Sequence, residues 1–255
     1  MGMLLETKGL TKRFGGLVAV KDFDIQVAEG EIVGLIGPNG AGKSTVFNLI
    51  TGVFPVTSGR VLFDGRDITG KQPEQVARLG IGRTFQLNPL FHEFTVLENV
   101  TSSFELHPHS SLFDIFFNTR KYRRNEAFIA ERAHEILHVV GLERVADELA
   151  KNLPHGHQKM LGVARALATR PRLLLLDEPL SGMNPSEIDT SLEAIRSMRD
   201  HGITILIVEH NMQILRLCDR VVVISFGQKI CEGSPAEVRA NEEVISAYFG
   251  ADYVC

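Results

Sequence analysis

The sequence predicts an α/β protein with a parallel β-sheet and a helical insertion. In the second half, short apolar runs alternate with helix-forming segments, which is typical of parallel strands joined by helical crossovers. In the first half, an apolar run at 33–36 leads through a glycine-rich turn into a helical segment at 45–50. Between them, residues 88–158 lose the alternation and contain helical stretches, so we assign them to the insertion.

The individual elements follow from local patterns. The first third is expected to be rich in β-strands, because glycines separate short apolar or alternating runs at 4–7, 18–21, 24–27 and 60–64. Within the insertion we expect a polar loop at 101–111 and helices at 112–118 and 125–140. After the insertion, strands are predicted at 173–176, 203–208 and 221–225, with helices at 185–200 and 212–217.

The composition excludes several classes of protein. The chain has 255 residues, of which 44% are hydrophobic, so it can fill a core and is not intrinsically disordered. Its net charge of −4 argues against binding nucleic acid through bulk electrostatics. No apolar run approaches the length of a membrane helix, and the N-terminus does not resemble a signal peptide. Because the cysteines form no metal-ligand or CxxC pattern, we expect a reduced cytosolic protein without a structural metal.

A glycine-rich phosphate loop is the strongest motif in the chain. It matches G-x-x-x-x-G-K-[ST] between a strand and a helix, and it consists of Gly37, Pro38, Asn39, Gly40, Ala41, Gly42, Lys43, Ser44 and Thr45. The glycines let successive backbone N–H groups converge on phosphate oxygens, and the helix N-terminus adds its positive end. We expect Lys43 to reach the β- and γ-phosphates and the Ser44 hydroxyl to ligate Mg²⁺, which predicts a P-loop NTPase core.

Two acids follow the apolar strand at 173–176. Open α/β sheets bind ligands beyond the carboxyl ends of their strands, which is where Asp177 and Glu178 are placed. We expect Asp177 to hold Mg²⁺, directly or through water, and Glu178 to polarise the attacking water. Solvated acids capping a strand are the alternative, and the phosphate loop makes that alternative the less favoured one.

With these motifs in place, four further elements make the chain similar to the ATP-binding cassette (ABC) ATPases. Gln86 ends the run 82–86 and resembles the family's Q-loop glutamine. Residues 181–185 resemble the D-loop, His210 resembles the switch histidine, and Phe14 stands where an aromatic residue stacks on adenine. Each element alone has an ordinary structural explanation, but together they occur in the family's order over essentially the whole chain.

The resemblance implies a fold and a set of roles. The implied fold is one ABC domain (1–255) with a RecA-like core, an N-terminal antiparallel β subdomain and a helical signature subdomain. Its implied parts are the β subdomain with the first half of the core (1–87), the helical subdomain (88–158), the second half of the core (159–230) and a C-terminal tail (231–255). ATP and Mg²⁺ are implied, with Gln86 sensing the metal and the water and relaying to a membrane partner, and His210 contacting the γ-phosphate.

One motif departs from the family. The usual signature Leu-Ser-Gly-Gly-Gln is replaced by a run that keeps only its leucine and one glycine, Leu153-Pro154-His155-Gly156-His157-Gln158. Pro154 offers neither a hydroxyl nor an N–H, although proline suits the first turn of a helix. We hypothesise that this helix still binds phosphate through its backbone, with His155 and His157 as donors that become charged below about pH 6.5. The alternative is a weakened site whose partner chain supplies the better signature.

Other segments resemble the ATPase subunits of branched-chain (hydrophobic) amino acid importers, namely 10–20, 82–86, the long insertion and 247–250. Related amide or urea importers share much of this pattern. The resemblance implies a second ATPase subunit (a homodimer or a paralogous heterodimer), two transmembrane permeases and, indirectly, a periplasmic binding protein. It implies a peripheral location at the cytoplasmic face of the inner membrane. The basic run 120–124 is either a face near the membrane or permease, or a solvated helix end.

Alternative functions arise from the same motifs. A soluble ABC protein acting on nucleic acid or the ribosome would normally carry two cassettes or long coiled coils, and this chain has one cassette and a negative net charge. A regulatory subunit that hydrolyses little ATP is the other alternative, and Pro154 is the reason to consider it. A P-loop kinase would leave Gln86 and His210 unexplained.

Overall fold

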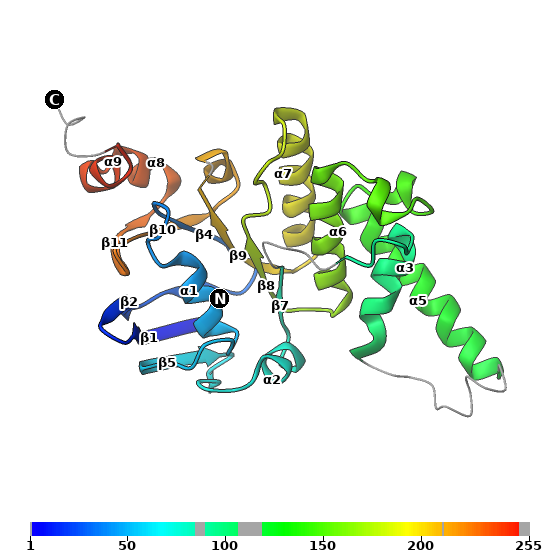
Figure 1. The fold of residues 1–255 in the computed structure, drawn as a ribbon, viewed down its shortest axis with the longest axis horizontal. Coiled ribbons are helices and arrows are strands. Elements are labelled where there is room, and N and C mark those ends of the chain that lie inside the picture. The colour runs from blue at the N-terminus through cyan, green and yellow to red at the C-terminus, as the bar shows by residue number, and fades with distance from the viewer. Residues whose placement is uncertain (1, 85–89, 107–118, 211, 250–255) are drawn as a thin grey trace.

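The computed structural model describes residues 2–84, 90–106, 119–210 and 212–249. Two β-sheets occupy one end of the molecule, and a group of helices that includes α3, α5 and α6 lies at the other end (Figure 1). The helix α7 lies between the sheets and this helical group (Figure 1).

The larger sheet is the parallel sheet that the alternating pattern predicts. It has six strands in the order β11-β10-β4-β9-β8-β7, and only β11 runs antiparallel to its neighbour. The strands are β4 (Ile32–Ile36), β7 (Ile81–Arg83), β8 (Leu173–Asp177), β9 (Thr204–Glu209), β10 (Arg220–Ser225) and β11 (Gln228–Gly233). Because β4, β9 and β8 are consecutive in this order, the residues after them meet at one edge of the sheet.

Both faces of this sheet are buried, and successive side chains of a strand therefore enter different cores. In β8, Leu174 and Leu176 pack into a core formed with the helical group, whereas Leu173 and Leu175 pack into a second core. The second core lies between the parallel sheet, α1 (Lys43–Ile50) and the antiparallel sheet. Burial on both faces explains why the strand is an unbroken run of leucines without polar alternation.

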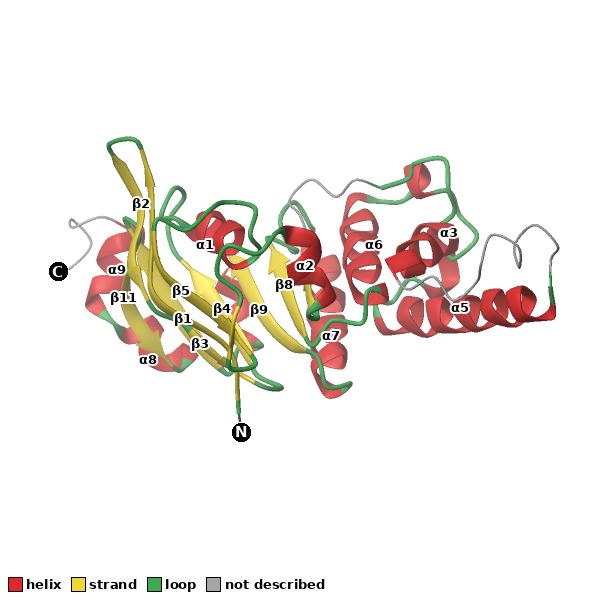
Figure 2. Cartoon of the chain, turned by 90° about the horizontal axis from the view of Figure 1, so that it is seen from below, coloured by secondary structure: helices red, strands yellow, loops and turns green. Residues whose placement is uncertain are grey.

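The smaller sheet is antiparallel and five-stranded, with β2-β1-β5-β6 in a row and β3 paired with β1. Its strands are β1 (Met3–Phe14), β2 (Leu17–Phe23), β3 (Gln26–Ala28), β5 (Ser58–Phe63) and β6 (Arg66–Asp67). Figure 2 shows β1, β2, β3 and β5 of this sheet together at the end of the molecule opposite α5. The predicted strand at 4–7 is only the first part of a longer strand that ends at Phe14.

Several of the described helices begin at a residue whose side chain caps them. For example, the Thr95 side chain accepts a hydrogen bond from the Glu98 N–H, and the Glu98 carboxylate accepts one from the Thr95 N–H, which starts α3. The α-helices other than α1 are α2 (Pro73–Arg78), α3 (Val96–Thr101), α5 (Arg120–Val139), α6 (His155–Ala168), α7 (Pro185–Asp200), α8 (Pro235–Ala240) and α9 (Glu242–Phe249). The 3₁₀ turns are η1 (Ser102–Leu106), η2 (Glu143–Val145), η3 (Ala150–Asn152) and η4 (Met212–Arg216). In the described part of the chain, no helix has both the length and the apolar character needed to cross a bilayer.

The predicted α/β class is confirmed, and several boundaries differ. The helix predicted at 185–200 has those bounds as α7, because Asn184 caps it and Pro185 occupies its first turn. The helix predicted at 212–217 is instead the short 3₁₀ turn η4, and part of the loop expected at 101–111 is also a 3₁₀ turn. The helix predicted at 125–140 starts five residues earlier, since Thr119 caps it. The helix predicted at 112–118 lies outside the described residues.

Candidate nucleotide-binding site

The phosphate loop connects β4 to α1 at the edge of the parallel sheet. Two of its glycines are required by geometry. A Cβ atom on Gly37 would lie 2.1 Å from the carbonyl oxygen of Ile224, so only glycine permits this approach to β10. Gly42 precedes α1 with a φ of 108°, a backbone conformation that other residues rarely adopt. The result is a compact loop whose N–H groups can surround an anion at the helix N-terminus.

Lys43 is buried beneath this loop. Its ammonium group donates hydrogen bonds to the carbonyl oxygens of Gly37 and Pro38, at 2.7 and 2.9 Å. Burial lowers the pKa of Lys43, and the nearby carboxylates of Glu178, Glu209 and Asp177 oppose that shift. The cation is therefore positioned inside the loop and close to a cluster of acids.

A pocket of about 470 Å³ opens beside the loop. Its polar wall contains Asn39–Thr45 and Glu178, and its remaining lining consists of Phe14, Leu17, Val18, Ala19, Phe226 and Gly227. Phe226 is 94% exposed, which is unusual for a phenylalanine, and it lies in the turn between β10 and β11. The pocket thus joins a phosphate-binding loop to an apolar, aromatic rim, as a nucleotide would require.

The aromatic ring of Phe14 lies at the end of β1, on this rim. It makes an edge-to-face contact with Phe54, with ring centroids 5.4 Å apart, and the Lys12 ammonium lies 4.8 Å from its centroid. These neighbours hold the ring in place while it remains exposed and lines the pocket. Phe14 is therefore available to stack on a base.

Asp177 ends β8 and is buried in an ion pair that no local sequence pattern predicts. The Arg83 guanidinium donates to its Oδ2 at 2.9 Å, and the exposed fractions of the two side chains are 8% for Arg83 and 6% for Asp177. Arg83 also donates to Asn48 Oδ1 and Thr51 Oγ1 in and after α1, at 2.8 and 3.0 Å. Strand β7 is thereby tied to both β8 and α1 below the phosphate loop.

Glu178 and His210 face each other across the strand ends. Glu178 Oε1 lies 3.9 Å from His210 Nδ1, with Glu178 mostly buried and His210 half-exposed. The backbone of Glu178 has a φ of 49°, which is left-handed and costly for a residue with a side chain. Glu178 lines the pocket, whereas Asp177 is not part of its lining and is buried in the pair with Arg83.

The divergent signature lies at the start of α6. Pro154 is the N-cap of this helix, so its missing N–H removes no helical hydrogen bond, and its carbonyl accepts from the Gln158 N–H. The imidazole of His155 packs against Gly182, where an added Cβ would lie 3.2 Å from the ring. A Cβ on Gly156 would lie 2.8 Å from the Glu187 carboxylate. The signature residues thus contact the segment between β8 and α7, and the first turn of α7, in their own chain.

The predicted site residues gather around the phosphate loop, with one exception. Gln86 lies outside the described residues. Ser44 and Thr45 begin α1 and line the pocket, and Glu178 and His210 lie near each other at the strand ends.

Arg83 and Phe226 are among the residues at the site that were not predicted from the sequence. No local signal in the sequence indicated the buried role of Arg83, because its partner Asp177 lies 94 residues further along the chain. Nor did any signal in the sequence point to Phe226, whose place on the rim depends on how β10 packs beside β4.

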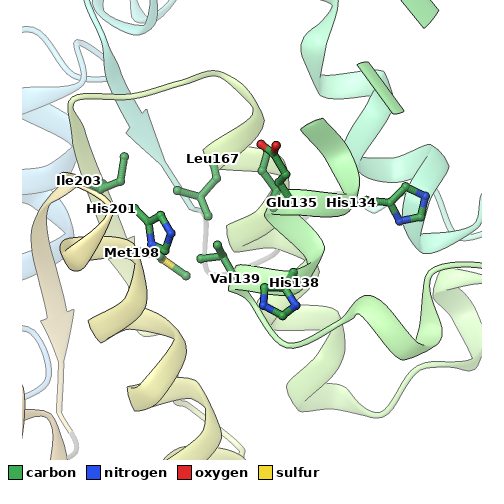
Figure 3. Close-up of a pocket in the computed structure, with 9 residues that line it drawn as sticks. His134, Glu135, His138, Val139, Leu167, Met198, His201 and Ile203 are labelled. Atoms are coloured by element: carbon green, nitrogen blue, oxygen red, sulfur yellow. The ribbon is translucent and has the colours of Figure 1, made fainter. Parts of the chain in front are cut away.

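A second cavity, of about 570 Å³, lies far from this chemistry, between α5, the end of α6, the end of α7 and the residues before β9. Figure 3 shows its mostly apolar lining, with His138 and His201 among Val139, Leu167 and Met198, and with His134 directed away from them. The cavity has the larger volume, but it contains no phosphate loop and none of the predicted site residues. We therefore assign the ligand site to the smaller pocket.

The chain resembles known proteins over most of its length. Residues 20–181 match the family model of ABC transporters, and residues 228–254 match that of branched-chain amino acid ATP-binding cassette transporters. The chain is 41% identical over 249 residues to the high-affinity branched-chain amino acid transport ATP-binding protein BraF of Pseudomonas aeruginosa, and the match covers 97% of this chain and 98% of that protein. LivG of Escherichia coli, with the same description, shows the same identity and coverage.

Solved structures with the same fold are also known. The ADP conformation of MJ1267, an ATP-binding cassette of an ABC transporter, superposes with a TM-score of 0.85 at 34% identity, covering 98% of this chain and 100% of that one. The dimeric structure of MJ0796, a bacterial ABC transporter cassette, gives a TM-score of 0.77 at 25% identity, covering 91% and 99% of the two chains.

Proposed function

Because this chain belongs to the ABC transporter family, we propose that it is the motor subunit of an importer for branched-chain or related amino acids. It is an ATP-binding subunit of that family, and ATP hydrolysis is its activity. The identity to BraF and LivG over nearly the whole chain supports the amino acid class, as does the match of residues 228–254. The single observation that carries the proposal is the pocket in which Glu178 faces a complete phosphate loop.

The loop and the rim would bind the two ends of ATP. Lys43 would exchange its hydrogen bonds to the loop carbonyls for the β- and γ-phosphates, while the loop N–H groups surround them. Phe14 and Phe226, on the apolar rim, would contact the adenine. The lining of the pocket supports this orientation, because it combines a polar wall at the loop with an apolar rim.

The oxygen ligands present fit Mg²⁺. The Ser44 hydroxyl at the start of α1 and the Asp177 carboxylate at the end of β8 are hard donors of the kind that Mg²⁺ prefers, and Gln86 is the third expected ligand. When bound, the metal would neutralise charge that develops on the phosphates. Because Arg83 engages Asp177 Oδ2, we expect Asp177 to act on the metal through water.

Hydrolysis would use the pair at the strand ends. Glu178 lines the pocket and would accept a proton from, or orient, the attacking water. His210, whose Nδ1 lies 3.9 Å from Glu178 Oε1, would contact the γ-phosphate. The attacking water would then be held between the Glu178 carboxylate and the γ-phosphate. In this arrangement Asp177 and Glu178, adjacent in the sequence, have separate roles because Glu178 lines the pocket, whereas Asp177 is buried in its pair with Arg83.

The complete importer would contain several other subunits. A similar cassette, MJ0796, is dimeric, and we expect the signature segment at 153–158 to face the nucleotide of a second ATPase subunit. Two transmembrane permeases would transmit the closure of that pair, and a periplasmic binding protein would deliver the solute. The chain would then lie at the cytoplasmic face of the membrane as a peripheral subunit, with residues 88–158 as its helical subdomain.

The proposal is tested by reconstitution with the permeases and any second cassette encoded beside it. ATP-dependent uptake of leucine, isoleucine or valine into vesicles is the expected result, and Lys43→Ala should abolish uptake by weakening ATP binding. If the complete assembly does not take up leucine, isoleucine or valine, the proposed substrate class is contradicted. If the same assembly still hydrolyses ATP, the motor function stands and the transported solute is a different one.

A further inference from the structure

The backbone at Glu178 requires an explanation. Its φ of 49° is left-handed, a conformation that residues other than glycine and asparagine rarely adopt without strain. A strained conformation persists only where the surroundings hold it. The Glu178 N–H donates to Val208 O on β9 at 2.9 Å, which holds one side of the residue. The residues after Glu178 are held by two buried ionisable side chains that make no contact with substrate in the proposed chemistry.

The first is Lys159, in the second turn of α6. Its side chain is buried, and its ammonium donates to the carbonyl oxygen of Glu178 at 3.0 Å. That carbonyl also accepts from the Ser181 N–H, so it begins the turn after the strand. A buried ammonium is costly unless it is well bonded, and here it binds the peptide group directly after the strained residue. Lys159 lies four residues after His155, in the helix that the signature begins.

The second is Glu209, the last residue of β9, whose exposed fraction is 0%. Its Oε1 accepts a hydrogen bond from the Leu180 N–H at 2.7 Å, and its Oε2 accepts one from the His210 N–H at 3.1 Å. One carboxylate therefore links the segment just before the D-loop to the backbone of the switch histidine. Charge-assisted bonds of this kind in a buried environment are stronger than neutral ones.

We propose that Lys159 and Glu209 are positioning residues that hold the segment 178–181 in its strained form, so that the signature helix, the D-loop and His210 move as one unit around Glu178. A buried cation holds the segment from the side of α6, and a buried anion holds it from the side of β9. His155 packed against Gly182 adds a third contact between α6 and this region. The proposal deepens the proposed hydrolytic function and rests on it.

These contacts would couple movements of the signature helix to the site. If α6 is displaced, as when a second subunit docks on its N-terminus, the hydrogen bond from Lys159 would move the peptide group after Glu178 with it. A displacement at 181–185 would reach His210 through the Glu209 carboxylate. The two groups proposed to act on the attacking water would thus be aligned together or lost together, which links turnover to the state of the interface.

The test compares Lys159→Met and Glu209→Gln with wild type, in the assembly in which the wild type hydrolyses ATP. Each variant keeps nearly the size of the side chain and removes its charge. We expect kcat at saturating ATP to fall by about 10- to 100-fold in each variant, as misalignment near a reacting centre does, while the dissociation constant of Lys159→Met for ATP changes by less than about twofold. The double variant should lose no more than the worse single variant, because both act on one segment.

Thr204→Val is the matched control. Thr204 is a buried residue at the opposite end of the same strand as Glu209, where its hydroxyl accepts from the Gly30 N–H at 2.9 Å. This variant should lower the melting temperature without changing kcat. If Lys159→Met or Glu209→Gln does not fold, Lys159→Arg and Glu209→Asp keep the charge and displace the contact, and they should show the same selective loss of kcat.

The outcomes separate the two proposals. Turnover of both charge-removing variants within about twofold of wild type would overturn the positioning roles and leave the hydrolytic function intact. The positioning roles would also be overturned if the losses of the two single variants add in the double variant and if ATP affinity falls as much as kcat. That result would indicate that the variants destabilise the whole domain. An absence of turnover in the wild type in every assembly would instead contradict the proposed function.

Discussion

Replacing Arg83 by methionine should destabilise the folded protein strongly. The arginine is the cation paired with buried Asp177, and it also donates hydrogen bonds to Asn48 and Thr51. Removing the cation leaves a carboxylate that is 6% exposed without this partner. Breaking a buried ion pair in this way typically costs about 3–5 kcal/mol. The two freed acceptors near α1 would add to this cost unless water reaches them.

The magnitude can be checked by contrast within the same chain. Arg172 also pairs with two carboxylates, Glu29 and Asp64, but its side chain is 44% exposed. Solvent screens such a pair, so Arg172→Met should cost less than about 1 kcal/mol. The structure thus predicts that Arg83→Met and Arg172→Met differ strongly in the unfolding free energy they remove, although the two arginines lie at similar distances from their carboxylates.

Urea unfolding followed by circular dichroism measures both costs. The double variant Arg83→Met/Asp177→Leu should recover much of the stability lost by Arg83→Met, because it removes the unpaired buried charge. A cost below about 1 kcal/mol for Arg83→Met, or no recovery in the double variant, would refute the reasoning that the pair is buried and coupled.

Three further predictions concern other parts of the chain. Asn184→Ala should lower the free energy of unfolding by about 1 kcal/mol in urea, because Asn184 and Glu187 cap α7 reciprocally at 3.0 and 2.9 Å, and an unchanged midpoint would contradict this. Burial raises the pKa of Cys218 to about 12 from 9.0, so its contribution to stability is complete below pH 9 and is lost as the pH rises toward 12. When the pH is raised from 8 to 10.5, the free energy of unfolding of wild type should fall by about 2 kcal/mol more than that of Cys218→Ala, which lacks the thiol. Equal decreases in the two proteins would be inconsistent with a buried thiol. Phe226→Ala should weaken ATP binding about 3- to 10-fold in a direct titration without lowering the melting temperature, whereas unchanged affinity would remove Phe226 from the site.

The backbone of the site was predictable because its residue types indicate the local backbone conformation. The phosphate loop needs glycine where Gly37 approaches β10 and where Gly42 has a positive φ, and glycines stand at both positions of the motif. The leucines of β8 indicate a strand buried on both faces, and the acids after it must then lie at the edge of the sheet. The predicted strand and loop positions agree with the structure for this reason.

The contacts that hold the site were not predictable in the same way. Arg83 and Asp177 are 94 residues apart, and nothing local indicates that β7 lies beside β8. Lys159 and Glu209 look like ordinary charged residues until tertiary packing buries them. The segment η4 has a helical pattern over too few residues to distinguish an α-helix from a 3₁₀ turn, and it forms the latter. Long-range burial, which no local pattern records, decides the roles of Arg83, Lys159 and Glu209.

The most direct test of the central claim compares ATP binding and turnover in wild type and in Glu178→Gln. If the pocket beside the phosphate loop hydrolyses ATP with Glu178 acting on the water, the variant should keep its affinity for ATP. Its turnover should fall by about 10²- to 10⁴-fold. Turnover of Glu178→Gln at the wild-type rate, or a wild-type protein that does not bind ATP, would contradict the account.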